Sequence, residues 1–550
     1  MKLSLAALAL SAAVVGPAAA QEISAQRLSD MTRELASDPY AGRAPGGPGE
    51  QKTIDFIVGQ FQALGLEPAG DNGGWTQAVP LWRYQTQTGG SFTLTSSAGS
   101  KPLQTQVDLR VETQRPVERV AIRAAPLVFV GYGVTAPERG WDDFKGVDLK
   151  GKIALILIND PDFEAKDGEP VAGKFGGRAA TYYARWTYKY EEAVRRGALG
   201  ALIIHETAGA AYGWSTVVAS NGESYDVVRK DPAKDKLLLQ GWIQRDLAAQ
   251  LFKDAGLDFE AEKLKARTTA FKPVTLKSAN FSADYRNAFT RLESRNVLAK
   301  ITGAKRPDES ILYAAHWDAY GIGPADASGA TIRPGAVDDA VGVAGVVETA
   351  RAFKAGPTPD RSIVFAAWTG EERGLLGSEF YAQANAATLP KMAANYTYDV
   401  LQTGGPAKDV VLVGSGQNEL EAHLAAVAAR HQRTITPDPK PERALFYRAD
   451  HFSVAKRGVP TILFMGMSGG ADLLNGGRAA GEKWVEDYTA RCYHQTCDRW
   501  EPTQDYAGAA QDVQLAFEAG RELANSDRWP GWNAASEFKP IRDETAALRK

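Results

Sequence analysis

The sequence predicts an α/β protein built around a central, mainly parallel sheet, with a second, β-rich domain inserted into it. From Asn296 onward, continuous apolar runs alternate with amphipathic stretches, which is typical of buried parallel strands separated by helices. Residues 127–271 instead contain short β-like runs, which indicates a separate unit. The length of the chain is consistent with more than one domain, because 550 residues exceed the roughly 100–200 residues of a single domain.

Composition and charge narrow the class of protein. Hydrophobic residues make up 44% and charged residues 23%, as in ordinary soluble globular chains with buried cores. The 63 basic and 66 acidic residues are mixed along the chain, so we expect no nucleic-acid partner. After the first 20 residues no run approaches the roughly 20 apolar residues of a membrane helix, so no integral membrane segment is expected.

The first 20 residues have the pattern of a secretory signal peptide. Lys2 precedes a mostly apolar stretch at 3–15, and small residues follow up to Ala20. We expect cleavage after Ala20 and a mature protein that is periplasmic or secreted. The alternative is an uncleaved anchor, but the apolar stretch is too short to span a membrane.

The segment that follows is predicted to be helical over much of 24–66, because apolar residues recur every three or four positions. Gly and Pro are too frequent at 42–49 for helix or strand, so a loop is expected there. Within 127–271 we expect three strands and one helix, at Leu127–Val130, Ile153–Ile158, Ala201–Ile204 and, for the helix, Tyr188–Arg196. We therefore assign 127–271 to an inserted domain and 21–126 with 272–550 to the main domain.

The main domain shows the strand-and-helix alternation. Apolar runs predict strands at Val297–Ile301, Ile311–Ala315, Ile363–Ala367, Val410–Val413 and Thr461–Phe464. Amphipathic stretches predict helices near Val341–Phe353, Leu375–Gln383, Glu419–Ala429 and Tyr506–Ala524. In layered folds of this kind, functional residues lie in loops at the carboxyl ends of the strands.

Chemically active side chains occur mostly at those predicted positions. The segments are His316-Trp317-Asp318, Asp338-Asp339, Glu371-Glu372, Asp399 and Tyr493-His494. Mixed imidazole and carboxylate ligands suit Zn²⁺, whereas oxygen-only sets suit Ca²⁺ or Mg²⁺. Two histidines with several carboxylates exceed the needs of one tetrahedral ion with an open position, but they suit two ions that share a carboxylate.

Each motif alone also has a simpler explanation. An acidic pair such as Glu371-Glu372 or Asp338-Asp339 can stabilise a helix N-terminus without binding anything. The occurrence of all the motifs in order, most of them at strand ends, favours a metal site. In an irregular turn, one of the two adjacent glutamates can bind metal while the other faces the attacking water as general base.

These motifs resemble the secreted co-catalytic di-zinc aminopeptidases, a zinc-exopeptidase family whose relatives include glutamate carboxypeptidases and glutaminyl cyclases. The resemblance covers nearly the whole mature chain, beginning at the Gly42-Arg43-Ala44-Pro45-Gly46 loop. The segments 127–133 and 146–152 resemble the protease-associated domain that many such enzymes carry as an insertion. The resemblance implies a three-layer domain and a hydrolase acting on peptide substrates.

The resemblance also implies roles for individual residues. It implies two Zn²⁺ ions held by His316, Asp338, Glu372, Asp399 and His494, with Asp338 bridging both. It makes Glu371 the general base and lets Asp318 hydrogen-bond the His316 ring. Tyr493 is a candidate donor to the oxyanion of the tetrahedral intermediate. The family further implies a cis peptide bond between Asp338 and Asp339.

Two local features of the sequence are not part of this implied metal site. Many family members have Ser-Asp-His-Phe, but this chain has Ala449-Asp450-His451-Phe452, so we assign Asp450 and His451 no catalytic role. Cys492 and Cys497, the two cysteines of the chain, flank His494. An oxidising compartment favours a disulfide between them over a structural zinc site, which would lack a fourth ligand.

Several functions remain open from sequence. An aminopeptidase is the first expectation, but a carboxypeptidase of the glutamate-carboxypeptidase type would use the same metals, with Arg448 available for the substrate carboxylate. A glutaminyl cyclase normally works with one zinc, so the complete bridging set argues against it. A receptor-like binding protein without metals is the alternative from a different class. The preferred N-terminal residue, the role of the insertion and the oligomeric state do not follow from the sequence.

Overall fold

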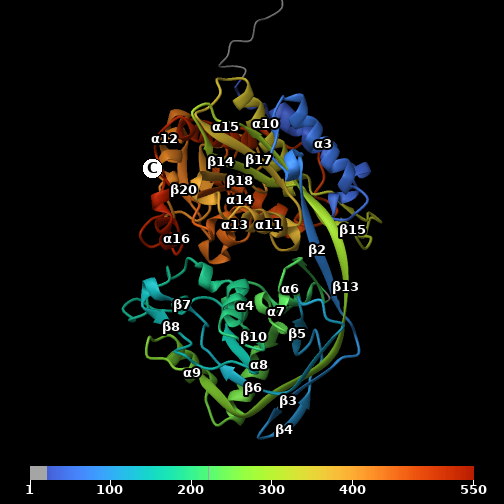
Figure 1. The fold of residues 1–550 in the computed structure, drawn as a ribbon, viewed down its shortest axis with the longest axis vertical. Helices are drawn as coiled ribbons and strands as arrows, with labels where there is room; N and C mark the ends of the chain where they lie inside the picture. The colour runs from blue at the N-terminus through green and yellow to red at the C-terminus, as the bar shows by residue number, and fades with distance from the viewer. Residues whose placement is uncertain (1–20, 221, 550) are drawn as a thin grey trace, which may run out of the picture.

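The computed structural model describes residues 21–220 and 222–549, which form two units joined by a long β-ribbon (Figure 1). We call residues 21–86 with 287–549 the upper unit and residues 87–286 the lower unit. The predicted signal peptide lies outside the described residues. Among the helices in the described part of the chain, none combines the length and the apolar character needed to cross a membrane.

The upper unit contains the predicted parallel sheet. Its strands lie in the order β21 (Thr461–Phe464), β18 (Met392–Tyr398), β14 (Arg306–His316), β17 (Arg361–Trp368) and β13 (Val274–Ile301). The first four are parallel, and β13 runs antiparallel to β17. The apolar runs of these strands are buried on both faces, which is typical of parallel sheets covered by helices. The predicted α/β fold class is confirmed.

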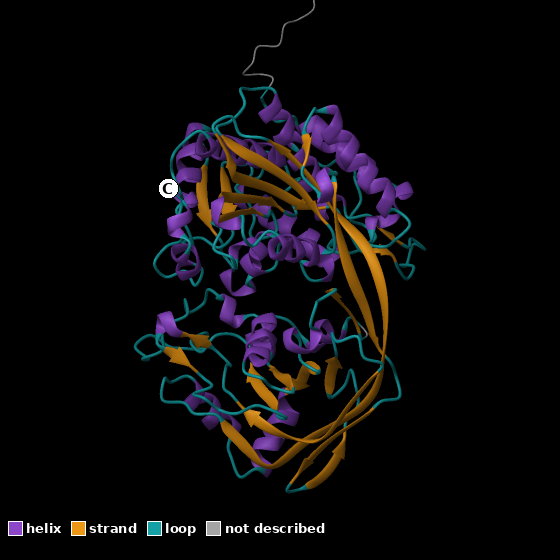
Figure 2. Cartoon of the chain, viewed as in Figure 1, coloured by secondary structure: helices purple, strands orange, loops and turns teal. Residues whose placement is uncertain are grey.

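Helices cover both faces of this sheet (Figure 2). One face packs against α2 (Ala25–Leu35), α3 (Glu50–Ala63), α10 (Val341–Lys354), α12 (Leu420–Arg430) and α15 (Ala507–Ala524). The other face packs against α11 (Leu376–Ala384) and α13 (His451–Ala455). The helices α14 (Gly477–Asp487) and α16 (Lys539–Glu544) do not belong to the buried core on either face of the sheet. The predicted helices end within one or two residues of the observed ones.

One predicted strand does not join the central sheet. The run at Val410–Val413 forms β19 (Asp409–Leu412), which pairs with β20 (Thr434–Pro437) in a separate two-stranded sheet. The expectation that it extends the main sheet is wrong, because β21 occupies the edge next to β18.

The long strand β13 links the two units. Its second half pairs antiparallel with β2 (Thr76–Thr86) from Asn287 to Val297, forming the ribbon that runs down one side of the molecule (Figure 1). Its first half pairs with β3 (Ser91–Ser96) and β6 (Arg119–Phe129) in the lower unit. The sequence analysis predicted only the end of this strand, Val297–Ile301, and missed the rest, because its alternating side chains include many polar residues.

The lower unit has its own sheet and core. Parallel strands β6, β9 (Ile153–Leu157), β10 (Gly200–His205) and β12 (Leu239–Gln244) form its centre, and β5 (Leu109–Glu112) adds antiparallel to β12. Its helices include α4 (Trp186–Arg195), α8 (Arg245–Asp254) and α9 (Phe259–Ala266). Its core takes in Phe92 and Phe281, so it extends beyond the expected 127–271 on both sides. Its assignment as a protease-associated domain stays a prediction.

The two units also touch directly. The ring centroids of Tyr182 and Phe452 are 5.0 Å apart, and the Tyr182 main-chain N–H donates to the Glu537 carboxylate at 2.9 Å. The Tyr447 hydroxyl donates to the same Glu537 oxygen at 2.9 Å. Arg178 of the lower unit pairs with Glu442 at 2.9 Å. The lower unit is therefore docked close to the segment 442–452.

Candidate metal centre

The predicted site residues meet at the carboxyl edge of the central sheet. His316 is the last residue of β14, Glu371 and Glu372 begin the turn η6 (Glu371–Arg373) after β17, and Asp399 follows β18. Asp338 lies in the turn η5 (Ala336–Ala340) that leads into α10. His494 arrives from a distant loop after η10 (Tyr488–Cys492). Parallel strands end at one edge, so residues far apart in sequence come together.

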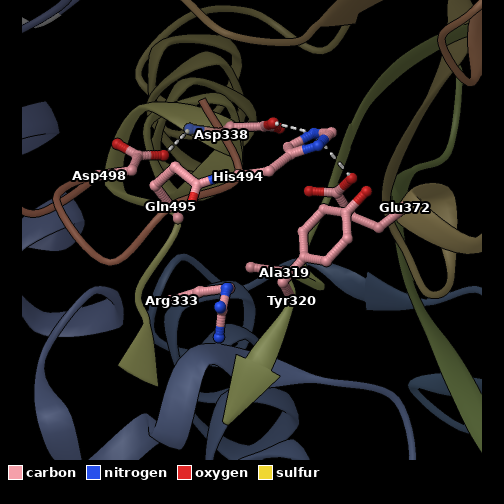
Figure 3. Close-up of a pocket in the computed structure, with 9 residues that line it drawn as sticks. Ala319, Tyr320, Arg333, Asp338, Glu372, His494, Gln495 and Asp498 are labelled. Carbon is pink, nitrogen blue, oxygen red and sulfur yellow. Dashed lines mark hydrogen bonds and ion pairs between the residues drawn. The ribbon is translucent and has the colours of Figure 1, made fainter. Parts of the chain in front are cut away.

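Asp338 stands between two histidines. Its Oδ1 lies 3.1 Å from Nε2 of His316. Its Oδ2 lies 3.2 Å from Nε2 of His494, a contact that Figure 3 shows. Asp399 Oδ1 lies 3.9 Å from the His316 Nε2, and Glu372 Oε2 lies 3.1 Å from the His494 Nε2. Two clusters of potential ligand atoms result, and both contain Asp338. All five predicted ligands are thus brought together.

The residues fit metal ions. The Nε2 atoms of His316 and His494 are buried without a hydrogen bond of good geometry, although each has carboxylate oxygens beside it. The Nδ1 of His316 lies 3.1 Å from the main-chain carbonyl of Asp318, which can only accept, so Nδ1 carries the proton and Nε2 keeps its lone pair. Imidazole with carboxylate is a donor set that suits zinc.

The electrostatics of the cluster favour positive charge. Burial lowers the pKa of His316, but the negative charge of Glu371 and the neighbouring carboxylate of Asp338 outweigh it and raise this pKa well above the ordinary value. Burial opposes ionisation of Asp338, but the two adjacent imidazoles, His316 and His494, hold its pKa below the ordinary range. Burial raises the pKa of Glu372 to about 7, and the Asp338 charge adds to this shift. A cation is therefore the natural occupant of such a cluster.

Glu371 belongs to neither cluster but lies beside one of them. Its Oε2 is 4.0 Å from the His316 Nε2, and burial raises its pKa well above the ordinary value. Its main-chain N–H donates to Oδ1 of Asp318 at 3.0 Å. Asp318 meets the His316 ring through its main-chain carbonyl and not through its carboxylate, whose Oδ1 is 3.8 Å from Nδ1. Asp318 therefore supports the ring through its carbonyl and the Glu371 turn through its carboxylate.

The turn at Asp338 has the expected cis peptide bond to Asp339. The carboxylate of Asp339 then points away from the metal cluster and accepts three main-chain N–H groups, from His316 at 3.3 Å, Gly342 at 3.1 Å and Val400 at 3.2 Å. Asp339 thereby ties the turn to β14 and to the residue after Asp399.

Two further charged residues support this turn, and the sequence analysis did not assign them roles. Arg43 is fully buried, and its guanidinium donates to the carbonyls of Trp317, Leu35, Pro334 and Gly335. The unusual Gly-Arg-Ala-Pro-Gly loop was the available signal for Arg43.

Asp498 acts on the same turn from the other side. Its carboxylate accepts the N–H groups of Val337 and Asp338 at 2.9 and 3.1 Å (Figure 3). Its position four residues after His494 gave no motif from which this role could be inferred.

His494 is held between two tyrosine rings. The Tyr493 ring centroid lies 3.6 Å from the imidazole centroid, and that of Tyr320 lies 4.3 Å away. Burial and the charges of Asp338 and Glu372 raise the pKa of Tyr493 well above the ordinary value, so its phenol stays a donor. The expected disulfide between Cys492 and Cys497 is present and closes the loop around His494.

The Asp450-His451 pair lies deeper in the molecule. Both carboxylate oxygens of Asp450 are buried without a hydrogen bond of good geometry, and burial raises its pKa to about 7. The nearest opposite charge to act on it is that of His316. His451 packs edge-on against Phe446, with ring centroids 4.8 Å apart. Sequence reasoning gave no role to Asp450, although it is one more acid beside the cluster.

This fold and this site define the class of protein: an α/β layered domain whose strand ends gather histidines and carboxylates into a centre suited to zinc. Residues 296–517 match the family described as Peptidase family M28. That segment contains all five predicted ligands.

Individual relatives match over shorter lengths. A segment of 105 residues is 41% identical to a "Probable zinc metalloprotease" of Pyrenophora teres f. teres (strain 0-1), covering 19% of this chain and 22% of that protein. A segment of 312 residues is 25% identical to a "Glutamate carboxypeptidase 2 homolog" of Caenorhabditis elegans, covering 50% and 37%. The chain therefore spans well under half the length of these curated relatives.

Among solved structures, the aminopeptidase from Aneurinibacillus sp. strain AM-1 is similar to this chain at 20% sequence identity. The alignment covers 91% of this chain and 94% of that one, with a TM-score of 0.49.

Proposed function

We propose that this protein is a zinc-dependent exopeptidase, and specifically an aminopeptidase that removes N-terminal residues from peptides. One observation carries the metal assignment: the two oxygens of Asp338 reach the free Nε2 atoms of two different histidines, at 3.1 and 3.2 Å. A carboxylate in that position can bridge two ions. We assign one ion to His316 and Asp399 and the other to Glu372 and His494.

Two bound Zn²⁺ ions would polarise the substrate carbonyl and acidify the attacking water. The chain supplies the remaining chemistry. Glu371 accepts the proton of the water and later delivers it to the leaving amine, and Asp318 holds the Glu371 main chain in place. The Tyr493 phenol, beside the same carboxylates, donates to the oxygen that gains negative charge.

The choice of an aminopeptidase rests on the surplus of acids beside the cluster. Glu371 is partly buried and Asp450 is fully buried, and neither carboxylate belongs to a ligand group. The α-ammonium group of a free N-terminus would provide the positive partner that Asp450 lacks. A carboxypeptidase is the second candidate, because Arg448 is exposed near Tyr493 and could bind a terminal carboxylate.

We further propose that the protein acts outside the cytoplasm, in the periplasm or after secretion. The disulfide between Cys492 and Cys497 supports this, because such bonds persist in oxidising compartments. The signal-like pattern of residues 1–20 points to the same location.

Two measurements test the proposal. Elemental analysis of the purified protein is expected to give two zinc ions per chain, whereas a metal-free protein would support the inert receptor-like alternative. Hydrolysis of leucyl-nitroanilide is then compared with that of an N-blocked dipeptide. Cleavage of the first alone supports an aminopeptidase, and cleavage of the second alone would replace it with a carboxypeptidase.

A further inference from the structure

A small pocket borders the candidate metal centre on the His494 side. It has a volume of about 170 Å³ and is lined by Asp338, Glu372 and His494 together with Tyr320, Gln495 and Asp498. One positively charged arginine, Arg333, lines it as well (Figure 3). Arg333 comes from β16 (Ile332–Arg333), part of the hairpin between Asp318 and Asp338.

The carboxylates of the pocket are already engaged by other groups. Asp338 lies between the two histidines, and Glu372 lies beside His494. Asp498 accepts N–H groups of the Asp338 turn and the hydroxyl of Tyr488. Within the described residues, the Arg333 guanidinium therefore has neither an ion pair nor a hydrogen bond.

The position of Arg333 is set by its neighbours. Its guanidinium lies against Gly323, the residue after the paired strand β15 (Gly321–Ile322), where a Cβ would come within 2.0 Å of Nη1. The side chain is partly buried, so it is not an ordinary solvated surface arginine. The absence of a side chain at Gly323 leaves room for the guanidinium at the pocket.

We propose that Arg333 is a specificity-determining residue that binds a carboxylate of the peptide substrate next to the scissile bond. This inference rests on the proposed peptidase function. A guanidinium offers two parallel N–H donors that match a carboxylate, and no carboxylate in the described part of the chain takes them. The carboxylate can come from an acidic side chain or from the C-terminus of a dipeptide.

The test compares paired substrates that differ only in a carboxylate or an amide. For a side-chain carboxylate the pairs are Glu-Ala-amide with Gln-Ala-amide and Ala-Glu-amide with Ala-Gln-amide. For the terminal carboxylate the pair is Ala-Ala with Ala-Ala-amide. The measured quantity is the ratio of kcat/KM between the members of each pair, for the zinc-loaded wild type and for R333M, R333K and G323A.

We expect R333M to lower this ratio by about tenfold or more in at least one pair, because hydrogen bonds between charged groups are strong. R333K should recover part of the loss, and G323A should lower the ratio by displacing the guanidinium. The affected pair identifies the source of the carboxylate. The exposed Arg286 of the lower unit provides the matched control, and R286M should leave every ratio unchanged.

A binding measurement separates recognition from turnover. In an E371Q background, titration calorimetry should show that R333M weakens binding of the carboxylate substrate but not of its amide partner. Unchanged ratios in all pairs, with unchanged binding, would overturn the role of Arg333. If the zinc-loaded wild type cleaves none of these peptides, the proposed function fails instead, so the two failures are distinct.

Discussion

Asp338 is the residue on which both halves of the candidate centre depend. It belongs to each cluster of ligand atoms, and its main-chain N–H donates to the Asp498 carboxylate at 3.1 Å. Glu371 lies within 4.0 Å of the same histidine but outside both clusters. Replacement of Asp338 and replacement of Glu371 should therefore affect zinc content and turnover differently.

Replacement of Asp338 by Ala is expected to remove both zinc ions and all activity, because each ion loses its shared ligand. Replacement of Glu371 by Ala should leave the zinc content intact and lower kcat by about 10²–10⁴-fold, as expected for loss of a general base. Elemental analysis and steady-state kinetics on both variants provide the measurement, with the exposed Asp308→Ala as control. Near-normal turnover in Glu371→Ala would show that another group is the base.

The buried imidazole of His451 should make the free energy of unfolding depend on pH. Burial lowers its pKa to about 3, whereas the pKa of a histidine in an unfolded chain is about 6.5. Between these pH values the unfolded chain binds a proton that the folded protein does not bind. This site should therefore lower the free energy of unfolding as the pH falls from about 6.5 toward 3, by about 1.4 kcal/mol per pH unit.

The measurement compares wild type with His451→Phe by urea unfolding at several pH values. The stability difference between the two proteins should move in favour of the variant as the pH falls below about 6.5. Parallel stability curves across that range would contradict the assignment of a neutral, buried imidazole.

At the scale of elements, the segment η1 (Asp38–Arg43) shows how a loop can support a site that it does not enter. Arg43 donates to four carbonyls, two of which belong to Pro334 and Gly335 just before the Asp338 turn. Another belongs to Trp317, beside His316. One guanidinium therefore fixes two segments that carry predicted ligands.

Replacement of Arg43 by Met is expected to cost about 3–5 kcal/mol of stability, because it leaves several buried carbonyls without donors. Arg43→Lys should recover little, since an ammonium group cannot reproduce the planar set of donors. Chemical unfolding monitored by fluorescence measures the loss, and the exposed Arg123→Met serves as control. A stability loss no larger than that of the control would show that the loop does not depend on Arg43.

At the scale of the whole molecule, the lower unit is attached in two ways. The β2–β13 ribbon connects it covalently and by strand pairing, and the Tyr182 segment docks it beside the residues that precede Asp450. Glu537 joins both sides of this contact by accepting from Tyr182 and Tyr447. The docking contact can be weakened without touching the metal cluster.

Replacement of Glu537 by Ala is expected to increase hydrogen exchange at residues 178–184, because the main-chain N–H of Tyr182 loses its acceptor. The central strands β14 and β17 and the zinc content should remain as in wild type. The exposed Glu544→Ala on α16 is the matched control. Unchanged exchange in the 178–184 segment would show that this contact between the units does not depend on Glu537.

The accuracy of the predictions from sequence differs between kinds of element. Strongly periodic segments such as Val341–Phe353 were placed almost correctly, because burial of one face dictates the spacing of apolar residues. The strand Val274–Ile301 was predicted only over its last residues, 297–301, since the polar alternation of the rest resembles loop composition. Arg43 and Asp498 were missed for another reason: their partners are main-chain groups, which leave no mark in the sequence.

The sequence by itself determined the α/β class, because apolar periodicity is a property of local residue order, and its resemblance to a known family supplied the five predicted ligands. Only the tertiary structure decided that Asp338 faces both histidines, that the Asp318 carboxylate holds the Glu371 main chain rather than the His316 ring, and that Arg333 faces the pocket. These facts depend on the directions of side chains that meet from distant strands. Such directions are fixed by packing and by main-chain hydrogen bonds across the fold, which no single segment contains.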